Sequence, residues 1–219
     1  MKEILDVACG GGRHVVGLAK RGYKCTGYDF TAERIQTAKV RAERSGVSVR
    51  LRRGDATQLR FTKVFDAVLA LYILFLLPDD EDIQRCLRGI HRALRPGGIM
   101  LSNVFNPFTT GKTWIAELLR KGERVDAVRA RGIRITEIMK VRSLDAMHGV
   151  MWVDETSFVE APDGRHVFRD RERARLLTYW EMLYHLKEAG FSKIECYQDW
   201  NRKQREKTKA EQLVFIGQK

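Results

Sequence analysis

The sequence lacks any apolar run long enough to cross a membrane as a helix. A spanning helix needs about 20 consecutive apolar residues, and the longest run here, Ala67 to Leu77, falls well short of that. We expect this run to form a buried strand that leads into a loop or a helix. Met1 and Lys2 are followed almost at once by a strand-like segment, so we expect neither a signal peptide nor a membrane partner.

Cysteine is also scarce, and low-complexity segments and internal repeats are absent. The chain has four cysteines, and they are scattered along it without the close spacing of a metal site. They are Cys9, Cys25, Cys86 and Cys196. We therefore expect no metal ion, and we interpret the cysteines as reduced thiols of a cytoplasmic protein.

The composition is that of a globular protein with a strongly basic surface. The 219 residues, 44% of them hydrophobic, suffice for one large α/β domain, or for one domain with a sizeable insertion. The net charge is +12 and is concentrated in the C-terminal half, in runs such as "RHVFRDRERARLL" and "NRKQREKTK". A solvated surface is the favoured interpretation of these runs, and a surface for nucleic acid or another polyanion is the alternative.

Strands and helices are predicted to alternate over the first 105 residues. Five strand-like segments are separated by amphipathic stretches, of which residues 31–46 begin with the helix-capping Thr31 and end at Gly46. The predicted strands are residues 4–8, 24–29, 47–55, 65–72 and 99–105. Such alternation predicts a parallel sheet with right-handed crossovers.

The alternation stops at Asn106. One predicted helix, residues 113–122, is followed by strand-like runs at 133–141, 149–161 and 165–171, and Ala161 to Gly164 form a hairpin turn. We interpret residues 106–175 as an antiparallel insertion that forms a substrate or lid region. A helix at 178–190 and two closing strands around a basic loop return the chain to the first domain, residues 1–105 and 176–219.

A glycine turn follows the first strand in "ILDVACGGGRHVVGLAKRGYKCTGYD". Gly10, Gly11 and Gly12 let the backbone pass close to a ligand, and the carboxyl ends of parallel strands form the usual ligand crevice. Asp29 ends the second strand seventeen residues beyond Gly12, where a carboxylate can accept hydrogen bonds from both hydroxyls of a ribose. The pattern predicts a cofactor that contains a nucleoside.

A dinucleotide is disfavoured by two residues. The G-x-G-x-x-G pattern requires a third glycine where this chain has Val15, and Asp6 places a carboxylate inside the strand. That carboxylate suits a cofactor with a positively charged end better than a diphosphate. The spacing of Asp6, Ala8, Gly10 and Gly12 favours a sulfonium with an amino-acid tail.

Four segments in this order resemble the class I S-adenosylmethionine-dependent methyltransferases. Beside the glycine turn, "RRGDATQL" resembles the family's adenine segment, "FDAVLALY" its fourth strand, and "IHRALRPGGIMLSNV" its helix, turn and fifth strand. The resemblance covers residues 3–105 closely and residues 176–217 more loosely. It implies a Rossmann-like, doubly wound, mostly parallel seven-stranded sheet with an antiparallel insertion after the fifth strand, and S-adenosyl-L-methionine as the cofactor.

The resemblance also implies roles for single residues. Asp6 would help to place the methionine amino group, Ala8 and Cys9 would line the methionine side, and Gly10 and Gly12 would let the backbone pass beside the cofactor. Asp29 would hold the ribose. The remaining positions would face the adenine or border the sulfonium: Phe30, Asp55 and Ala56 at the adenine, and Leu71 and Tyr72 at the sulfonium and substrate.

The expected reaction is an in-line transfer of a methyl group to a nitrogen or oxygen atom of a small molecule, for which the protein supplies alignment and a dry pocket. Substrate contacts are expected mainly in the insertion, and the candidates are Asn106, His148, Trp152 and Tyr179. No catalytic base is assigned, and His185 is interpreted as a helix histidine. The sequence also lacks the Asn-Pro-Pro-Tyr type of motif of enzymes that methylate exocyclic base amines.

Two alternatives remain open: an RNA or protein methyltransferase that uses the basic C-terminal half, and a non-catalytic methyltransferase-like subunit. The second is suggested by the start of the chain, because the family normally places one or two helices before the first strand. Three explanations stay open here: a misassigned start, a truncated chain, or a cover supplied by the insertion or another subunit. The last of these modestly favours a homo-oligomer.

Overall fold

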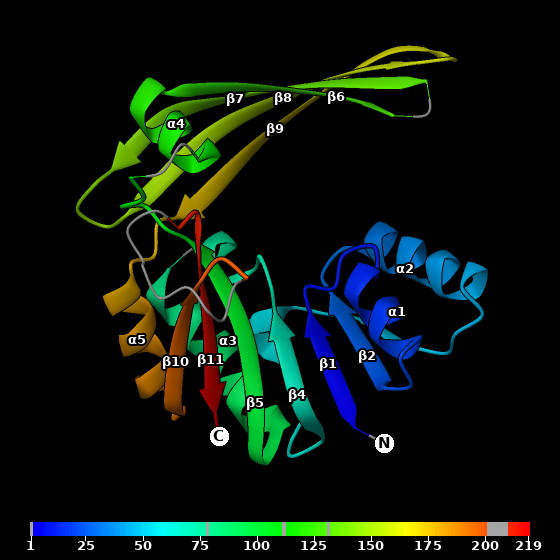
Figure 1. The fold of residues 1–219 in the computed structure, drawn as a ribbon, viewed down its shortest axis with the longest axis vertical. Coiled ribbons are helices and arrows are strands. Elements are labelled where there is room, and N and C mark those ends of the chain that lie inside the picture. The colour runs from blue at the N-terminus through cyan, green and yellow to red at the C-terminus, as the bar shows by residue number, and fades with distance from the viewer. Residues whose placement is uncertain (1, 78, 111–112, 131, 201–209) are drawn as a thin grey trace.

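The computed structural model of the chain describes residues 2–77, 79–110, 113–130, 132–200 and 210–219. It contains two sheets, one within a layered α/β body and one that extends above it (Figure 1). The basic loop predicted at 201–209 lies outside the described residues. Among the described residues, no helix combines the length and the apolar character needed to span a membrane.

The first sheet has seven strands in the order β10-β11-β5-β4-β1-β2-β3. The five strands from β5 to β3 are parallel, whereas β11 runs antiparallel to both β5 and β10. The strands are β1 (Glu3–Val7), β2 (Lys24–Asp29), β3 (Arg50–Arg53), β4 (Phe65–Ala70), β5 (Leu94–Phe105), β10 (Ser192–Gln198) and β11 (Gln212–Gln218). The predicted fold class is confirmed.

Helices cover both faces of this sheet, because successive apolar side chains of β1 point to opposite faces and each needs a partner. Ile4 points to a cluster with Val15 and Val16 of one helix and Ala42 of the next, whereas Leu5 belongs to the larger cluster on the opposite face. The first face carries α1 (Arg13–Ala19) and α2 (Ala32–Arg44), and the second carries α3 (Asp80–Ala93) and α5 (Tyr179–Glu188). Two short 3₁₀ turns, η1 (Ala56–Gln58) and η2 (Leu74–Leu76), follow β3 and β4.

The second sheet is antiparallel, in the order β6-β7-β8-β9, and follows α4 (Trp114–Lys121). Its strands are β6 (Glu123–Ala130), β7 (Ile133–Asp145), β8 (Val150–Ala161) and β9 (Gly164–Arg175). The predicted helix, the hairpin turn and three of the strands are confirmed. The sequence analysis missed β6, because its residues alternate arginine, aspartate and alanine with only two valines and offer little apolar periodicity.

A small core joins the second sheet to α4 and to the end of β5. Ile115 and Leu118 of α4 are buried against Met151 and Val153 of β8, and Phe105 packs at the edge of the same cluster. At the end of β9 beside this core, the Arg175 guanidinium lies 2.8 Å from an Asp80 carboxylate oxygen at the start of α3. The division of the chain into residues 1–105 with 176–219 and residues 106–175 remains a prediction.

Several boundaries differ from the prediction. The strands predicted at 47–55 and 65–72 are shorter, Arg50–Arg53 and Phe65–Ala70, and Asp55 caps η1 instead of ending a strand. The helix was expected to run into a Pro-Gly-Gly exit before a strand at 99–105, but α3 ends at Ala93 and β5 begins at Leu94. The register between β4 and β5 shifts between Phe65 and Ala67, so the exit segment is accommodated as an irregular first part of the strand.

Candidate functional site

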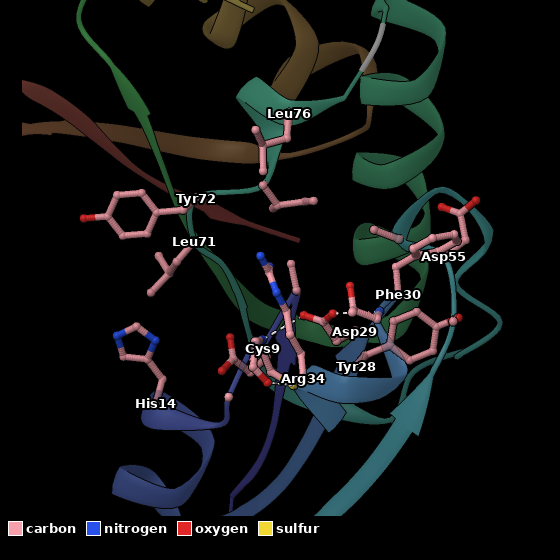
Figure 2. Close-up of a pocket in the computed structure, with 18 of the residues that line it drawn as sticks. Cys9, His14, Tyr28, Asp29, Phe30, Arg34, Asp55, Leu71, Tyr72 and Leu76 are labelled. Carbon is pink, nitrogen blue, oxygen red and sulfur yellow. Dashed lines mark hydrogen bonds between the residues drawn. The ribbon is translucent and has the colours of Figure 1, made fainter. Parts of the chain in front are cut away.

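A pocket of about 700 Å³ lies at the carboxyl ends of β1, β2 and β4. Figure 2 shows its lining, with Tyr28, Phe30 and Asp55 on one side and His14, Leu71 and Tyr72 on the other. Ten of the eleven positions predicted to contact a cofactor line it: Asp6, Ala8, Cys9, Gly10, Asp29, Phe30, Asp55, Ala56, Leu71 and Tyr72. The exception is Gly12.

The glycine turn forms the floor of the pocket. Gly10 has a φ of 51°, and a Cβ atom built there would meet nothing within 4 Å, so the backbone is open to the cavity. Gly12 has a φ of 76° and is the N-cap of α1, where a Cβ atom would come within 2.7 Å of the Ala38 side chain. Gly12 is therefore required for the close packing of α1 on α2, while Gly10 borders the cavity.

Asp29 joins the end of β2 to the glycine turn. One carboxylate oxygen accepts a hydrogen bond from the Gly10 amide at 2.8 Å, and the other accepts from the Thr31 amide at 3.0 Å. The side chain is buried. Each oxygen still has a second lone pair, so the carboxylate can accept further hydrogen bonds from a ligand in the pocket.

Asp6 is a buried carboxyl group with an unsatisfied oxygen. Its Oδ2 atom has no hydrogen-bond partner among the described residues, although the side chain is only 2% exposed. Burial, and then repulsion from Asp29, raise the pKa of Asp6 to about 7. A cationic group in the pocket would satisfy the orphaned oxygen and favour the ionised form.

Asp55 stands at the opposite end and has a structural role as well. Its side chain caps η1, because one oxygen accepts from both the Thr57 amide and the Thr57 hydroxyl at 2.8 Å. Phe30 beside it is 68% exposed, so the ring has a free face towards the cavity mouth. An aromatic face and a carboxylate at one end suit a planar ring that carries an amino group.

None of the four predicted substrate residues lines this pocket. Asn106 is buried and donates a hydrogen bond to the Ala210 carbonyl. His148 and Trp152 line a separate, shallower pocket on the second sheet, where the His148 ring lies 2.7 Å from Asp145. Tyr179 stacks against Phe215 beneath the first sheet. Substrate contact by these residues thus has no support from their positions in this structure.

The sequence analysis missed His14 and two arginines of the pocket. His14 lies two residues beyond the glycine turn, and partial desolvation, with Arg13 beside it, lowers the pKa of its imidazole. Arg34 and Arg41 come from α2, and Arg41 donates to the Gly11 carbonyl at 2.7 Å. The positions of His14 and Arg34 in the first helical turns after two predicted strands could have identified them, since these turns meet at the same crevice. Arg41 lies in the last turn of α2 and had no such signal.

The second sheet has two chemically different faces. Alternation along paired strands places Glu137, Glu155 and Glu172 on the face that carries the α4 core, which we call the inner face. Burial and Asp170 raise the pKa of Glu172, and the pocket residue Arg34 opposes them. β9 contacts η2, whose Leu76 lines the pocket, so the second sheet lies near the pocket rim. The opposite, outer face carries the β9 arginines Arg165, Arg169, Arg171 and Arg173.

A family model described as a methyltransferase domain matches residues 4–98. A putative methyltransferase of Geobacillus sp. (strain WCH70) is 27% identical over 221 residues, which cover all of this chain and 85% of that protein. A ubiquinone biosynthesis O-methyltransferase of Pectobacterium carotovorum subsp. carotovorum (strain PC1) is 31% identical over 162 residues, or 73% of this chain and 63% of that protein. This chain thus matches less than two thirds of the length of that O-methyltransferase.

The fold has a counterpart among solved structures. An S-adenosylmethionine-dependent methyltransferase from Clostridium acetobutylicum ATCC 824 superimposes with a TM-score of 0.83 at 16% identity. The superposition covers 99% of this chain and 83% of that one. Both sheets of the present structure therefore recur in another protein.

Proposed function

We propose that this chain is a class I S-adenosylmethionine-dependent methyltransferase that methylates a nitrogen or oxygen atom of a small molecule. The observation that carries the proposal is the pocket at the ends of β1, β2 and β4, which is of a size for a nucleoside cofactor and part of an acceptor. The similarity to a ubiquinone biosynthesis O-methyltransferase supports a small acceptor.

The residues present fit the cofactor. The unsatisfied Oδ2 atom of Asp6 suits the cationic amino group of the methionine tail, and the open backbone at Gly10 leaves room beside Ala8 and Cys9. We assign the ribose to Asp29 and the adenine to Phe30, Asp55 and the Ala56 amide. When bound, the cofactor supplies a methyl group on a positively charged sulfur, which is a good leaving group.

The protein's own part in the reaction is alignment and exclusion of water. Leu71 is buried at the end of β4 and presents an apolar surface to the pocket, where a desolvated acceptor reacts faster. We assign acceptor specificity to residues 106–175, because β9 contacts η2, whose Leu76 lines the pocket, and the inner face of this sheet carries Glu172. The acidic side chains of that face would favour acceptors without negative charge.

The experiment that tests the proposed function is a methyl-transfer assay with radiolabelled cofactor. The purified chain is offered a panel of small phenols, catechols and amines in parallel with bulk RNA and bulk protein. We expect turnover on members of the small-molecule panel only. Turnover restricted to RNA or protein would contradict the proposal, and absence of turnover on every acceptor would support the non-catalytic alternative.

The ribose assignment has a separate test. Asp29→Ala is expected to abolish binding of S-adenosylhomocysteine in calorimetry, because it removes an acceptor and loosens the glycine turn. Asp66→Ala is the matched control, since Asp66 also accepts a backbone hydrogen bond, from Glu3, but lies outside the pocket. Unchanged affinity in Asp29→Ala would contradict the ribose role.

A second candidate, methylation of RNA, is favoured by one observation. The outer face of the second sheet repeats arginine at alternate positions of β9, and such a row can follow a phosphate backbone. Two of these arginines are engaged by acids, Arg165 by Glu160 and Arg171 by Asp154, which weakens the case. The test is RNA affinity between low and moderate salt: a steep fall supports this candidate, and a flat response removes it.

A further inference from the structure

Tyr72 has a backbone conformation that is unfavourable for its residue type. It follows β4 at the pocket, and its φ is 57°, in the left-handed region that a residue with a large side chain rarely adopts. Such conformations persist only where the surroundings enforce them, and they gather at functional sites. The surroundings of Tyr72 supply such a constraint.

Two polar residues of the neighbouring strands hold Tyr72 at both ends. The Tyr72 amide donates to the Asn103 Oδ1 atom at 2.9 Å, and the Tyr72 hydroxyl donates to the Gln212 Oε1 atom at 3.2 Å. Asn103, on β5, is fully buried and donates to the same Gln212 oxygen at 2.9 Å. The Asn103–Gln212 pair thus ties the backbone and the side chain of Tyr72 to one rigid part of the sheet.

The ring of Tyr72 lies between the cofactor pocket and the insertion. Figure 2 places it on the same side of the pocket as Leu71 and His14, away from Phe30 and Asp55. Its centroid is 6.1 Å from that of Phe105, which in turn lies 4.7 Å from Trp114 of α4. Tyr72 is 40% exposed, so part of its surface is available to a ligand.

We propose that Asn103 and Gln212 are positioning residues that hold Tyr72 as the acceptor-side wall of the pocket, opposite the end assigned to adenine. This inference rests on the proposed function and deepens it. The ligand is a small acceptor with a planar or apolar body that packs on the exposed surface of the ring. Its nucleophilic atom then points towards the part of the pocket bordered by Leu71.

The first test needs no acceptor and no turnover. In amide hydrogen exchange by NMR, the Tyr72 amide of the free protein is expected to be protected by its bond to Asn103, although the residue lies at a pocket mouth. Asn103→Leu, of similar volume, is expected to remove this protection over residues 71–76 and to leave β5 protected. Gln212→Leu is the second variant, in case Asn103→Leu does not fold. Protection unchanged in the variants would overturn the inference.

The second test separates acceptor binding from cofactor binding. With the best acceptor of the panel, Gln212→Leu is expected to raise KM about tenfold, and to change the affinity for S-adenosylhomocysteine by less than about threefold, since only the acceptor wall moves. Gln198→Leu is the matched control, because Gln198 is a buried glutamine of the adjacent strand, opposite Leu213, and has no hydrogen bond to Tyr72. It is expected to leave KM unchanged.

A double-variant cycle decides whether the pair acts through Tyr72. If it does, Gln212→Leu has no further effect on KM in a Tyr72→Ala background. Additive effects of the two substitutions, or a parallel loss of cofactor affinity, would overturn the inference. Absence of methyl transfer to every acceptor of the panel would instead count against the proposed function. The hydrogen-exchange measurement would still test whether Asn103 and Gln212 hold Tyr72 in place.

Discussion

At the scale of single residues, the candidate site depends on carboxyl groups whose surroundings differ. Asp29 has both oxygens engaged by backbone amides, whereas Asp6 is equally buried and has an oxygen with no partner among the described residues. The sequence could predict that both acids belong to one crevice, because each lies at the end of, or within, a strand beside the glycine turn. It could not predict which one carries the unsatisfied atom, since that depends on three-dimensional contacts.

The pKa of Asp6 leads to a pH-dependent cofactor affinity. A raised pKa of about 7 means that the carboxyl is mostly protonated at pH 6 and mostly ionised at pH 7.5. If the ionised form binds the amino group, the affinity for S-adenosylhomocysteine should rise about eightfold between these pH values, in step with the ionised fraction. Calorimetry at both pH values measures this, and Asp6→Asn should bind more weakly and without the pH dependence. A wild-type affinity that falls as pH rises would contradict the assignment.

Gly12 has a packing role that the sequence pattern did not indicate. The sequence pattern places it beside the cofactor, but its α-carbon lies against Ala38. Gly12→Ala should therefore lower the free energy of unfolding by about 2 to 3 kcal/mol, from the unfavourable φ together with the steric clash. Gly22→Ala is the control, because Gly22 has a similar φ of 85° but open space around it, and should cost about 1 kcal/mol. If urea denaturation showed the same loss of unfolding free energy for Gly12→Ala and Gly22→Ala, the packing role would be contradicted.

At the scale of elements, the sequence predicted what local periodicity determines. The strands from β1 to β5 and the helices between them have clear apolar patterns and turn residues, so their order and type were predicted. β6 was not, because its stability comes from pairing with β7 rather than from its own apolar residues. The substrate candidates stay predictions, and none of them lines the pocket. The register of β8 puts Trp152 opposite Arg173, on the outer face, and no local signal fixes that register.

Two acidic side chains, Glu137 and Glu155, interact on the inner face of the second sheet. Burial raises the pKa of Glu155 to about 7, and a hydrogen bond with Glu137 adds to the effect. An acid with a raised pKa in the folded state destabilises the fold as pH rises from its unfolded value through about 7. The free energy of unfolding of Glu155→Gln, relative to that of the wild type, should therefore increase by about 1 kcal/mol between pH 5 and pH 8. Thermal unfolding would show this as a rise of a few degrees in the Tm of the variant relative to the wild type.

The matched control for this pair is Glu160→Gln. Glu160 lies on the same strand but on the outer face, where it pairs with Arg165. The free energy of unfolding of Glu160→Gln should differ from that of the wild type by the same amount at pH 5 and at pH 8. A loss of stability for Glu155→Gln at pH 8 would show that the carboxylates of the inner face are stabilised by other groups.

At the scale of the whole molecule, the fold combines two kinds of sheet. The parallel sheet brings the ends of β1, β2 and β4 together, so a cofactor site arises from segments far apart in the sequence. The antiparallel sheet extends above it (Figure 1), and Phe105 and Trp114 connect the two. The sequence and the family resemblance could predict the parallel sheet and the presence of an antiparallel insertion. The position of the insertion over the first sheet depends on long-range packing around α4, which single-sequence patterns do not encode.

The most direct test of the central claim is a calorimetric titration of the purified chain with S-adenosylhomocysteine and, separately, with NAD. If the pocket holds a sulfonium nucleoside between Asp6 and Asp29, S-adenosylhomocysteine should bind with an affinity in the micromolar range, and NAD should give no saturable heat. Saturable binding of NAD without binding of S-adenosylhomocysteine would contradict the claim.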